Sequence, residues 1–110
     1  MKQSQPVASY NCYIINPPED GYEITGATTI VPGQQFETTI SSASLSFLDY
    51  NLLDKIAVNG EELSSDKYTL QPNLPDNFTG LLTITDTNEI KGDVYLSFFT
   101  RGTFMAKETK

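Results

Sequence analysis

The chain of 110 residues contains no histidine, no tryptophan and a single cysteine. The absence of histidine excludes Ser-His-Asp and Cys-His catalysis and the usual zinc ligand sets, so no metal site is expected. A single cysteine cannot form an intrachain disulfide. Cys12 lies in the strand-like run YNCYII, and a lone thiol in such a run is typically a small buried apolar group without a catalytic role.

Long hydrophobic runs and glycine-rich loops are also missing. No apolar run approaches the roughly 18–20 residues that span a membrane as a helix. The first ten residues, MKQSQPVASY, lack an uninterrupted apolar core after Lys2, so we expect neither a signal peptide nor a membrane contact. The segments GQQF and GLLT do not repeat glycine as a phosphate-binding loop does, and no cofactor is therefore expected.

Basic residues are scarce in the body of the chain. The net charge is −7, and the segment from Asn16 to Thr100 holds thirteen acidic residues and three lysines. Such a body repels phosphate backbones, so direct binding of nucleic acid is not expected. The last ten residues, RGTFMAKETK, carry a net charge of +2. This basic end either docks on an acidic neighbour or remains in solvent.

The residues that are present favour a single all-β domain over residues 1–110, since a chain of this length matches one domain. Apolar side chains alternate with a period of two, as they do when one face of a strand is buried. Val, Ile, Thr, Tyr and Phe, which favour strands, dominate these runs. The runs are YEITGATTIV, QQFETTI, KIAV, KYTL, LLTI and VYLSF.

Turn signals separate these runs and predict about eight short strands in a sandwich or small barrel. The prolines of NPPEDG cannot continue a strand because proline lacks an amide donor. Pro32-Gly33 suits a type II turn, and Asn59-Gly60 suits a two-residue hairpin. The segments SSDK, QPNLPDNFTG and TDTNEIKGD are also expected to be turns. The leucine spacing within residues 46–56 indicates one short helical turn.

The segment KIAVNGEELSSDKYTL, residues 55–70, gathers five charged side chains. These side chains either perform chemistry or form the solvated corner of a hairpin. We favour the corner, because adjacent residues on a strand point to opposite faces, and Glu61 and Glu62 therefore do not form a catalytic carboxylate pair. The Ser-Ser-Asp segment that follows is expected to bond to the backbone of the next turn.

The segment DTNEIKGD, residues 86–93, matches part of a calcium-binding loop, since Asp86 and Asn88 stand at the first and third ligand positions. The pattern then fails, because isoleucine at the fifth position cannot coordinate and lysine replaces the glycine required at the sixth. We expect an ordinary polar turn. A looser cation site that includes Asp93 remains the alternative.

Four short segments in the second half of the chain occur in a particular order: NG at 59–60, KYT at 67–69, LTIT at 82–85 and GD at 92–93. Together with the strands around them, residues 53–99 resemble the recurring β-unit of bacteriophage virion proteins, in particular head-decoration and tail-fibre modules of immunoglobulin-like type. The resemblance implies a single immunoglobulin-like antiparallel β-sandwich.

The same resemblance implies a non-enzymatic structural protein that decorates the capsid or belongs to a fibre or tail. Such a protein is made in the host cytoplasm, resides in the virion and acts through protein–protein contacts. Its expected partners are the major capsid protein, other virion proteins and further copies of the chain in a homo-oligomer. Residues 1–9, as an N-terminal arm, and the basic end at 101–110 are expected to contact neighbours. No catalytic, cofactor-binding or metal residues carry over, because the motif defines a fold and not a site.

Two other functions are left open. The tyrosines at positions 10, 13, 22 and 50 are either core residues or a surface that stacks on sugars, as in a carbohydrate- or cell-surface-binding module. The absence of tryptophan counts against that module. The second alternative is an acidic inhibitor of a nucleic-acid-binding host enzyme. It requires a surface row of carboxylates, for which the candidates are Glu61, Glu62, Asp66, Asp86 and Glu89.

Overall fold

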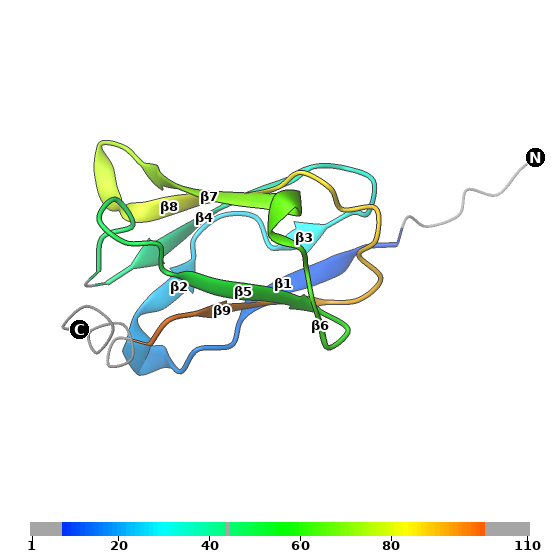
Figure 1. Cartoon of the computed structure of the whole chain (residues 1–110), viewed down its shortest axis with the longest axis horizontal. Helices are drawn as coiled ribbons and strands as arrows, with labels where there is room; N and C mark the ends of the chain where they lie inside the picture. The colour runs from blue at the N-terminus through cyan, green and yellow to red at the C-terminus, as the bar shows by residue number, and fades with distance from the viewer. Residues whose placement is uncertain (1–7, 44, 101–110) are drawn as a thin grey trace, which may run out of the picture.

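The computed structural model describes residues 8–43 and 45–100, which form two β-sheets packed as a sandwich (Figure 1). Two short 3-10 helices, η1 and η2, span Pro18–Asp20 and Ser65–Lys67. The strands are β1 Tyr10–Ile14, β2 Tyr22–Ile24, β3 Thr29–Ile30, β4 Phe36–Ser42, β5 Leu53–Val58, β6 Glu61–Glu62, β7 Tyr68–Asn73, β8 Asp76–Ile84 and β9 Val94–Phe98. The prediction of an all-β sandwich is confirmed.

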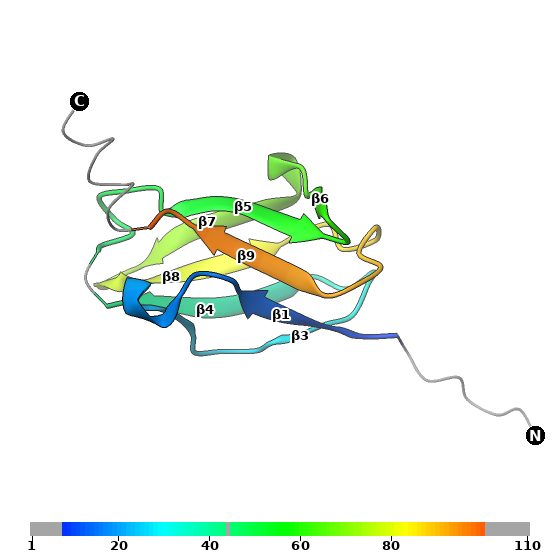
Figure 2. The same cartoon turned by 90° about the horizontal axis from the view of Figure 1, so that it is seen from below.

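The strands are divided into a five-stranded sheet of order β3-β1-β9-β5-β6 and a four-stranded sheet of order β2-β4-β8-β7. Figure 2 looks onto the five-stranded sheet, with β4, β7 and β8 behind it. The strand pairs are antiparallel, as expected, except that β1 runs parallel to β9. None of the helices in the described part of the chain is long and apolar enough to cross a membrane.

The core lies between the sheets and follows the predicted alternation. In β9, Val94, Leu96 and Phe98 are buried, whereas Tyr95 between them is exposed. The same pattern buries every second residue of β4 and the last three alternate positions of β8. Each fully buried aliphatic side chain contributes roughly 1.5–3 kcal/mol, so these central strands hold the two sheets together.

Most of the predicted turns are found. Gly33 has a φ of 91°, and the Gln34 amide donates to the Val31 carbonyl over 3.0 Å, as a type II turn requires. The segment NPPEDG leaves the strand and forms η1. The segment QPNLPDNFTG is an exception, because β7 continues to Asn73 and β8 begins at Asp76. Proline is tolerated there because β7 is an edge strand.

The segment of residues 46–56, where one short helical turn was predicted, contains a turn that does not extend into a helix. Residues 47–49 form a simple turn, and β5 begins at Leu53. Leu48 is exposed while Leu52 is fully buried, so the two leucines do not share the face that their spacing suggested. The Phe47 amide donates to the Asn77 carbonyl over 2.9 Å, so this turn is tied to the first residues of β8.

The run YEITGATTIV is also divided, since β2 belongs to the four-stranded sheet and β3 to the five-stranded sheet. Thr28 is exposed although it stands two residues before the buried Ile30, so the alternation does not hold across this run. The chain crosses between the sheets at Gly26, where an added Cβ would lie 2.8 Å from Thr38 Oγ1. The predicted basic end at 101–110, and all but the last two residues of the N-terminal arm, lie outside the described residues.

Candidate functional site

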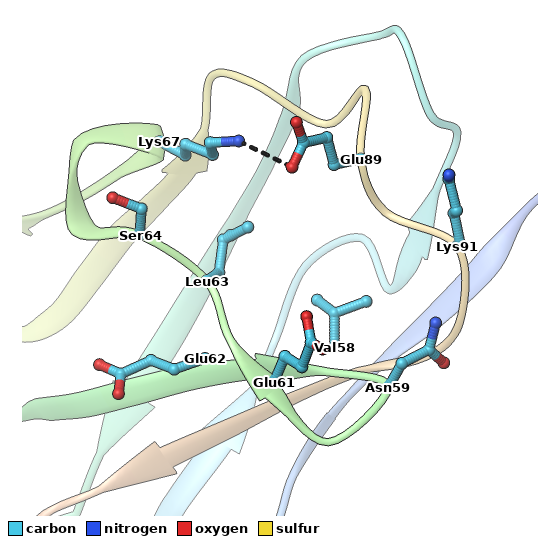
Figure 3. Close-up of a pocket in the computed structure, with 9 residues that line it drawn as sticks. All are labelled: Val58, Asn59, Glu61, Glu62, Leu63, Ser64, Lys67, Glu89 and Lys91. Carbon is cyan, nitrogen blue, oxygen red and sulfur yellow. Dashed lines mark ion pairs between the residues drawn. The ribbon is translucent and has the colours of Figure 1, made fainter.

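The charged segment of residues 55–70 forms the β5–β6 hairpin and then η2. Asn59 and Gly60 have φ angles of 54° and 78°, which confirms the predicted two-residue turn. Glu61 and Glu62 are both exposed, and Figure 3 shows their carboxylates diverging. They do not face each other across a cleft, so the geometry is that of a hairpin corner.

An open hollow of about 510 Å³ lies between this hairpin and the loop of residues 86–93 (Figure 3). Val58 and Leu63, which are largely buried, supply its apolar lining. The loop packs so closely on the hairpin that a Cβ atom added at Gly92 would overlap Asn59 Oδ1. The charged side chains around the hollow are Glu61, Glu62, Lys67, Glu89 and Lys91.

Lys67 lies between carboxylates of the facing loop. Its Nζ is 3.3 Å from Glu89 Oε1 and 3.9 Å from Asp86 Oδ2. Such solvent-exposed ion pairs contribute roughly 0–1 kcal/mol each. The cation also interrupts the row of carboxylates that an acidic inhibitor would present. The Ser64 hydroxyl donates to Asp66 Oδ1 over 2.7 Å, a side-chain contact in place of the predicted bond to the backbone.

The two acidic ends of the loop at 86–93 point to different partners. Asp86 Oδ1 accepts the amide of Asn88 over 3.1 Å, while Asp93 Oδ1 accepts the amide of Asn11 over 3.0 Å. Within residues 8–43 and 45–100, no three His, Cys, Asp or Glu side chains are grouped to hold a metal ion. The Ile90 amide donates to the Thr87 carbonyl over 3.1 Å, so the loop contains a hydrogen-bonded turn at residues 87–90.

Cys12 belongs to the core, and the partly buried Tyr22 packs against it. Cys12 is only 2% exposed, and burial raises the pKa of its thiol to about 12, so the thiol is protonated at neutral pH. Tyr22 stacks on Phe98 with ring centroids 4.6 Å apart, and its hydroxyl donates to the Phe99 carbonyl over 2.8 Å. Burial and, to a lesser extent, the charge of Asp20 raise the pKa of Tyr22 to about 12.

Tyr13 has a different environment, because it stands on the outer face of the five-stranded sheet beside Tyr95. The two residues are direct neighbours in the β1–β9 pair, and their rings stack with centroids 5.6 Å apart at an angle of 21°. Tyr13 is 44% and Tyr95 39% exposed, and Ile15, which directly follows β1, is 57% exposed. We call these three residues the tyrosine face.

The outer face of the four-stranded sheet has the opposite character. Between the buried residues of β4 lie Glu37, Thr39 and Ser41, and the outward positions of β7 include Thr69 and Gln71. The two outer faces thus differ in chemistry, one carrying stacked aromatic rings and the other mainly hydroxyl and amide groups. Tyr95 was not among the tyrosines singled out by sequence, although its alternation with Val94 and Leu96 predicts an outward side chain.

A groove runs along one open side of the sandwich between β5 and β7. It consists of two adjoining hollows of about 310 and 380 Å³, which share Asn51 and Leu70. Leu53 and Leu70 contribute apolar surface, and Asp49, Asp54 and Glu62 contribute carboxylates. We call this feature the side groove.

Tyr68 lines the side groove, and its pKa reflects the charges around the groove. Burial is the main reason why its pKa is raised, and the charges of Glu62 and then Asp54 raise the pKa further. A negative charge disfavours the phenolate because like charges repel. The groove therefore lies in a region of negative potential, which the sequence alone did not indicate.

No known protein family, curated protein or solved structure matches this chain. Inference about its function therefore depends on the residues and geometry described above.

Proposed function

We propose that the chain is a non-enzymatic structural protein of a bacteriophage virion, where it decorates the capsid or belongs to a fibre or the tail. It acts through contacts with the major capsid protein or other virion proteins, and it reaches the virion after synthesis in the host cytoplasm. The resemblance of residues 53–99 to immunoglobulin-like virion modules motivates this proposal.

The tyrosine face is the observation that carries the proposal. Tyrosine is enriched in protein interfaces because its ring buries a large apolar area while its hydroxyl keeps a hydrogen-bond partner. Tyr13 and Tyr95 are already held side by side on adjacent strands, so little side-chain entropy is lost when a partner covers them. A rigid sheet with one aromatic outer face suits a module that attaches to a larger assembly.

The experiment tests incorporation of the full chain into particles of the virus that encodes it. The chain is supplied as wild type, as a Tyr13→Ser/Tyr95→Ser variant, and as a Thr39→Ser/Ser41→Ala control on the other outer face. Wild type and control are expected to co-sediment with purified particles, and the tyrosine variant to be reduced at least tenfold. Incorporation of the tyrosine variant at the wild-type level would remove the face as the contact, and a wild-type chain absent from particles would overturn the proposed function.

The tyrosine face also favours one second candidate, a carbohydrate- or cell-surface-binding module, because exposed aromatic rings stack on sugars. Asn11, whose side chain donates to the Tyr13 hydroxyl over 3.4 Å, would supply polar contact beside the rings. Binding to a glycan array that disappears in the Tyr13→Ser/Tyr95→Ser variant would favour this module. An array without hits for the wild-type chain would remove it.

A further inference from the structure

The side groove is bordered by two strand edges that have backbone groups free to pair. β7 is the last strand of its sheet. β5 pairs with β6 only at Ala57 and Val58, which leaves its first residues without a neighbour on the groove side. Unpaired edges of this kind accept an additional extended segment through main-chain hydrogen bonds. Elsewhere in the described residues, the edge strands β2, β3 and β6 have only two or three residues each.

The chemistry of the groove specifies what such a segment must carry. Leu53 and Leu70 offer apolar surface, Asp54 and Glu62 offer negative charge, and no described residue that lines the groove is basic. A complementary segment is therefore extended, cationic, and supplied with at least one large apolar side chain.

We propose that the side groove binds residues 101–110 of a second copy of this chain. The segment RGTFMAKETK combines Arg101, Lys107 and Lys110 with Phe104 and Met105 and has a net charge of +2. Ten extended residues span roughly 33 Å, whereas the six residues of β7 span about 20 Å, so the segment is long enough to follow the whole edge. The inference rests on the proposed structural function, since it supplies a contact between subunits.

The position of the last strand favours a second copy over the segment's own groove. β9 pairs with the edge of β5 that faces away from the groove. The Phe99 amide donates to the Leu52 carbonyl over 2.9 Å, so the chain leaves the sheet on that side, level with Asn51, where the two hollows adjoin. To enter its own groove the segment has to cross the chain that leads into β5, whereas a segment from a neighbouring copy does not. The contact is heterologous, so repeated binding builds rings or filaments.

The test uses full-length chains and sedimentation velocity over a concentration series to about 100 µM, in low salt and in about 0.5 M NaCl, which screens charges. The groove variant is Asp54→Lys/Glu62→Lys and the tail variant is Arg101→Glu/Lys107→Glu. The control, Glu23→Lys/Glu37→Lys, makes the same charge change as the groove variant but on the other sheet.

The wild-type chain and the control are expected to associate in low salt and to dissociate in high salt. Each of the two charge variants alone should associate at least tenfold more weakly. Their equimolar mixture should associate again, because it pairs an unchanged groove with an unchanged tail.

A wild-type chain that stays monomeric, or a mixture that does not recover, overturns the inference. So does association that persists in both charge variants but disappears in Tyr13→Ser/Tyr95→Ser, since the tyrosine face would then be the contact between copies. These results leave the proposed function intact if the chain is still found in particles, whereas absence from particles overturns the proposed function alone.

Discussion

Two buried threonines should respond in opposite directions to the same isosteric substitution. Thr38 is 3% and Thr87 2% exposed. The hydroxyl of Thr38 has no hydrogen-bond partner among the described residues. The hydroxyl of Thr87 donates to the Gln34 carbonyl over 2.8 Å and accepts the Gly33 amide over 2.9 Å, so it joins the loop at 86–93 to the turn after β3.

The magnitudes follow from what each substitution to valine leaves behind. A buried polar group without a partner costs about 1–3 kcal/mol, so Thr38→Val should stabilise the fold by about 1–2 kcal/mol. Thr87→Val removes the hydrogen bonds to the Gly33 amide and the Gln34 carbonyl, which should destabilise the fold by about 1–3 kcal/mol. Both variants keep the side-chain shape, so packing changes little.

The assay is urea unfolding at pH 7, followed by circular dichroism and by the fluorescence of the six tyrosines, which no tryptophan obscures. The midpoint should rise for Thr38→Val and fall for Thr87→Val, with similar m values. The exposed Thr85, whose hydroxyl donates to the Lys67 carbonyl, provides a control: Thr85→Val should change stability by less than about 1 kcal/mol. A loss of stability in Thr38→Val equal to that in Thr87→Val would mean that the Thr38 hydroxyl is satisfied.

Three further substitutions test the core, the groove and the crossing between the sheets. Burial raises the pKa of the Cys12 thiol from 9.0 to about 12, so the protonated thiol favours the folded state fully below pH 9. This contribution, about 4 kcal/mol, is lost as the pH rises from 9 to about 12. Cys12→Ala should therefore reduce the loss of stability at alkaline pH in unfolding curves, and an unchanged dependence of stability on pH would contradict the burial. Glu62→Gln should lower the pKa of Tyr68, measured by ultraviolet titration, whereas Glu61→Gln should leave it unchanged; equal effects would contradict the groove electrostatics. Gly26→Ala should destabilise the fold by about 1–3 kcal/mol, because the added Cβ would collide with β4. An unchanged melting temperature would show that β4 can move to accommodate it.

The sandwich could be predicted because alternation alone defines which side of each strand is buried. Val94, Leu96 and Phe98 are an example, since their burial and the exposure of Tyr95 both follow from a period of two. The Asn59-Gly60 hairpin was predictable for a local reason, because few residue pairs tolerate two positive φ angles. The leucine spacing within residues 46–56 was a poorer guide, since Leu48 is exposed and Leu52 is buried, and a hydrogen bond from Phe47 to Asn77, distant in sequence, holds the turn.

The candidate contacts were less accessible to sequence reasoning because they depend on which strands become neighbours. Tyr13 and Tyr95 are far apart in the chain and meet only through the parallel β1–β9 pair, which turn signals do not specify. The side groove combines Asp54, Glu62 and Leu70 from three strands of both sheets. Its negative charge depends on these strands lining one open side of the sandwich between β5 and β7, which the sequence does not specify.

The number of copies of this chain in purified virus particles is the most direct test of a structural role in the virion. Quantitative mass spectrometry with isotope-labelled peptides, such as one from the segment between Lys67 and Lys91, gives its ratio to the major capsid protein. A fixed stoichiometric ratio that is reproduced between preparations is expected. A chain that is abundant in infected cells but present only in traces in the particles would contradict this role.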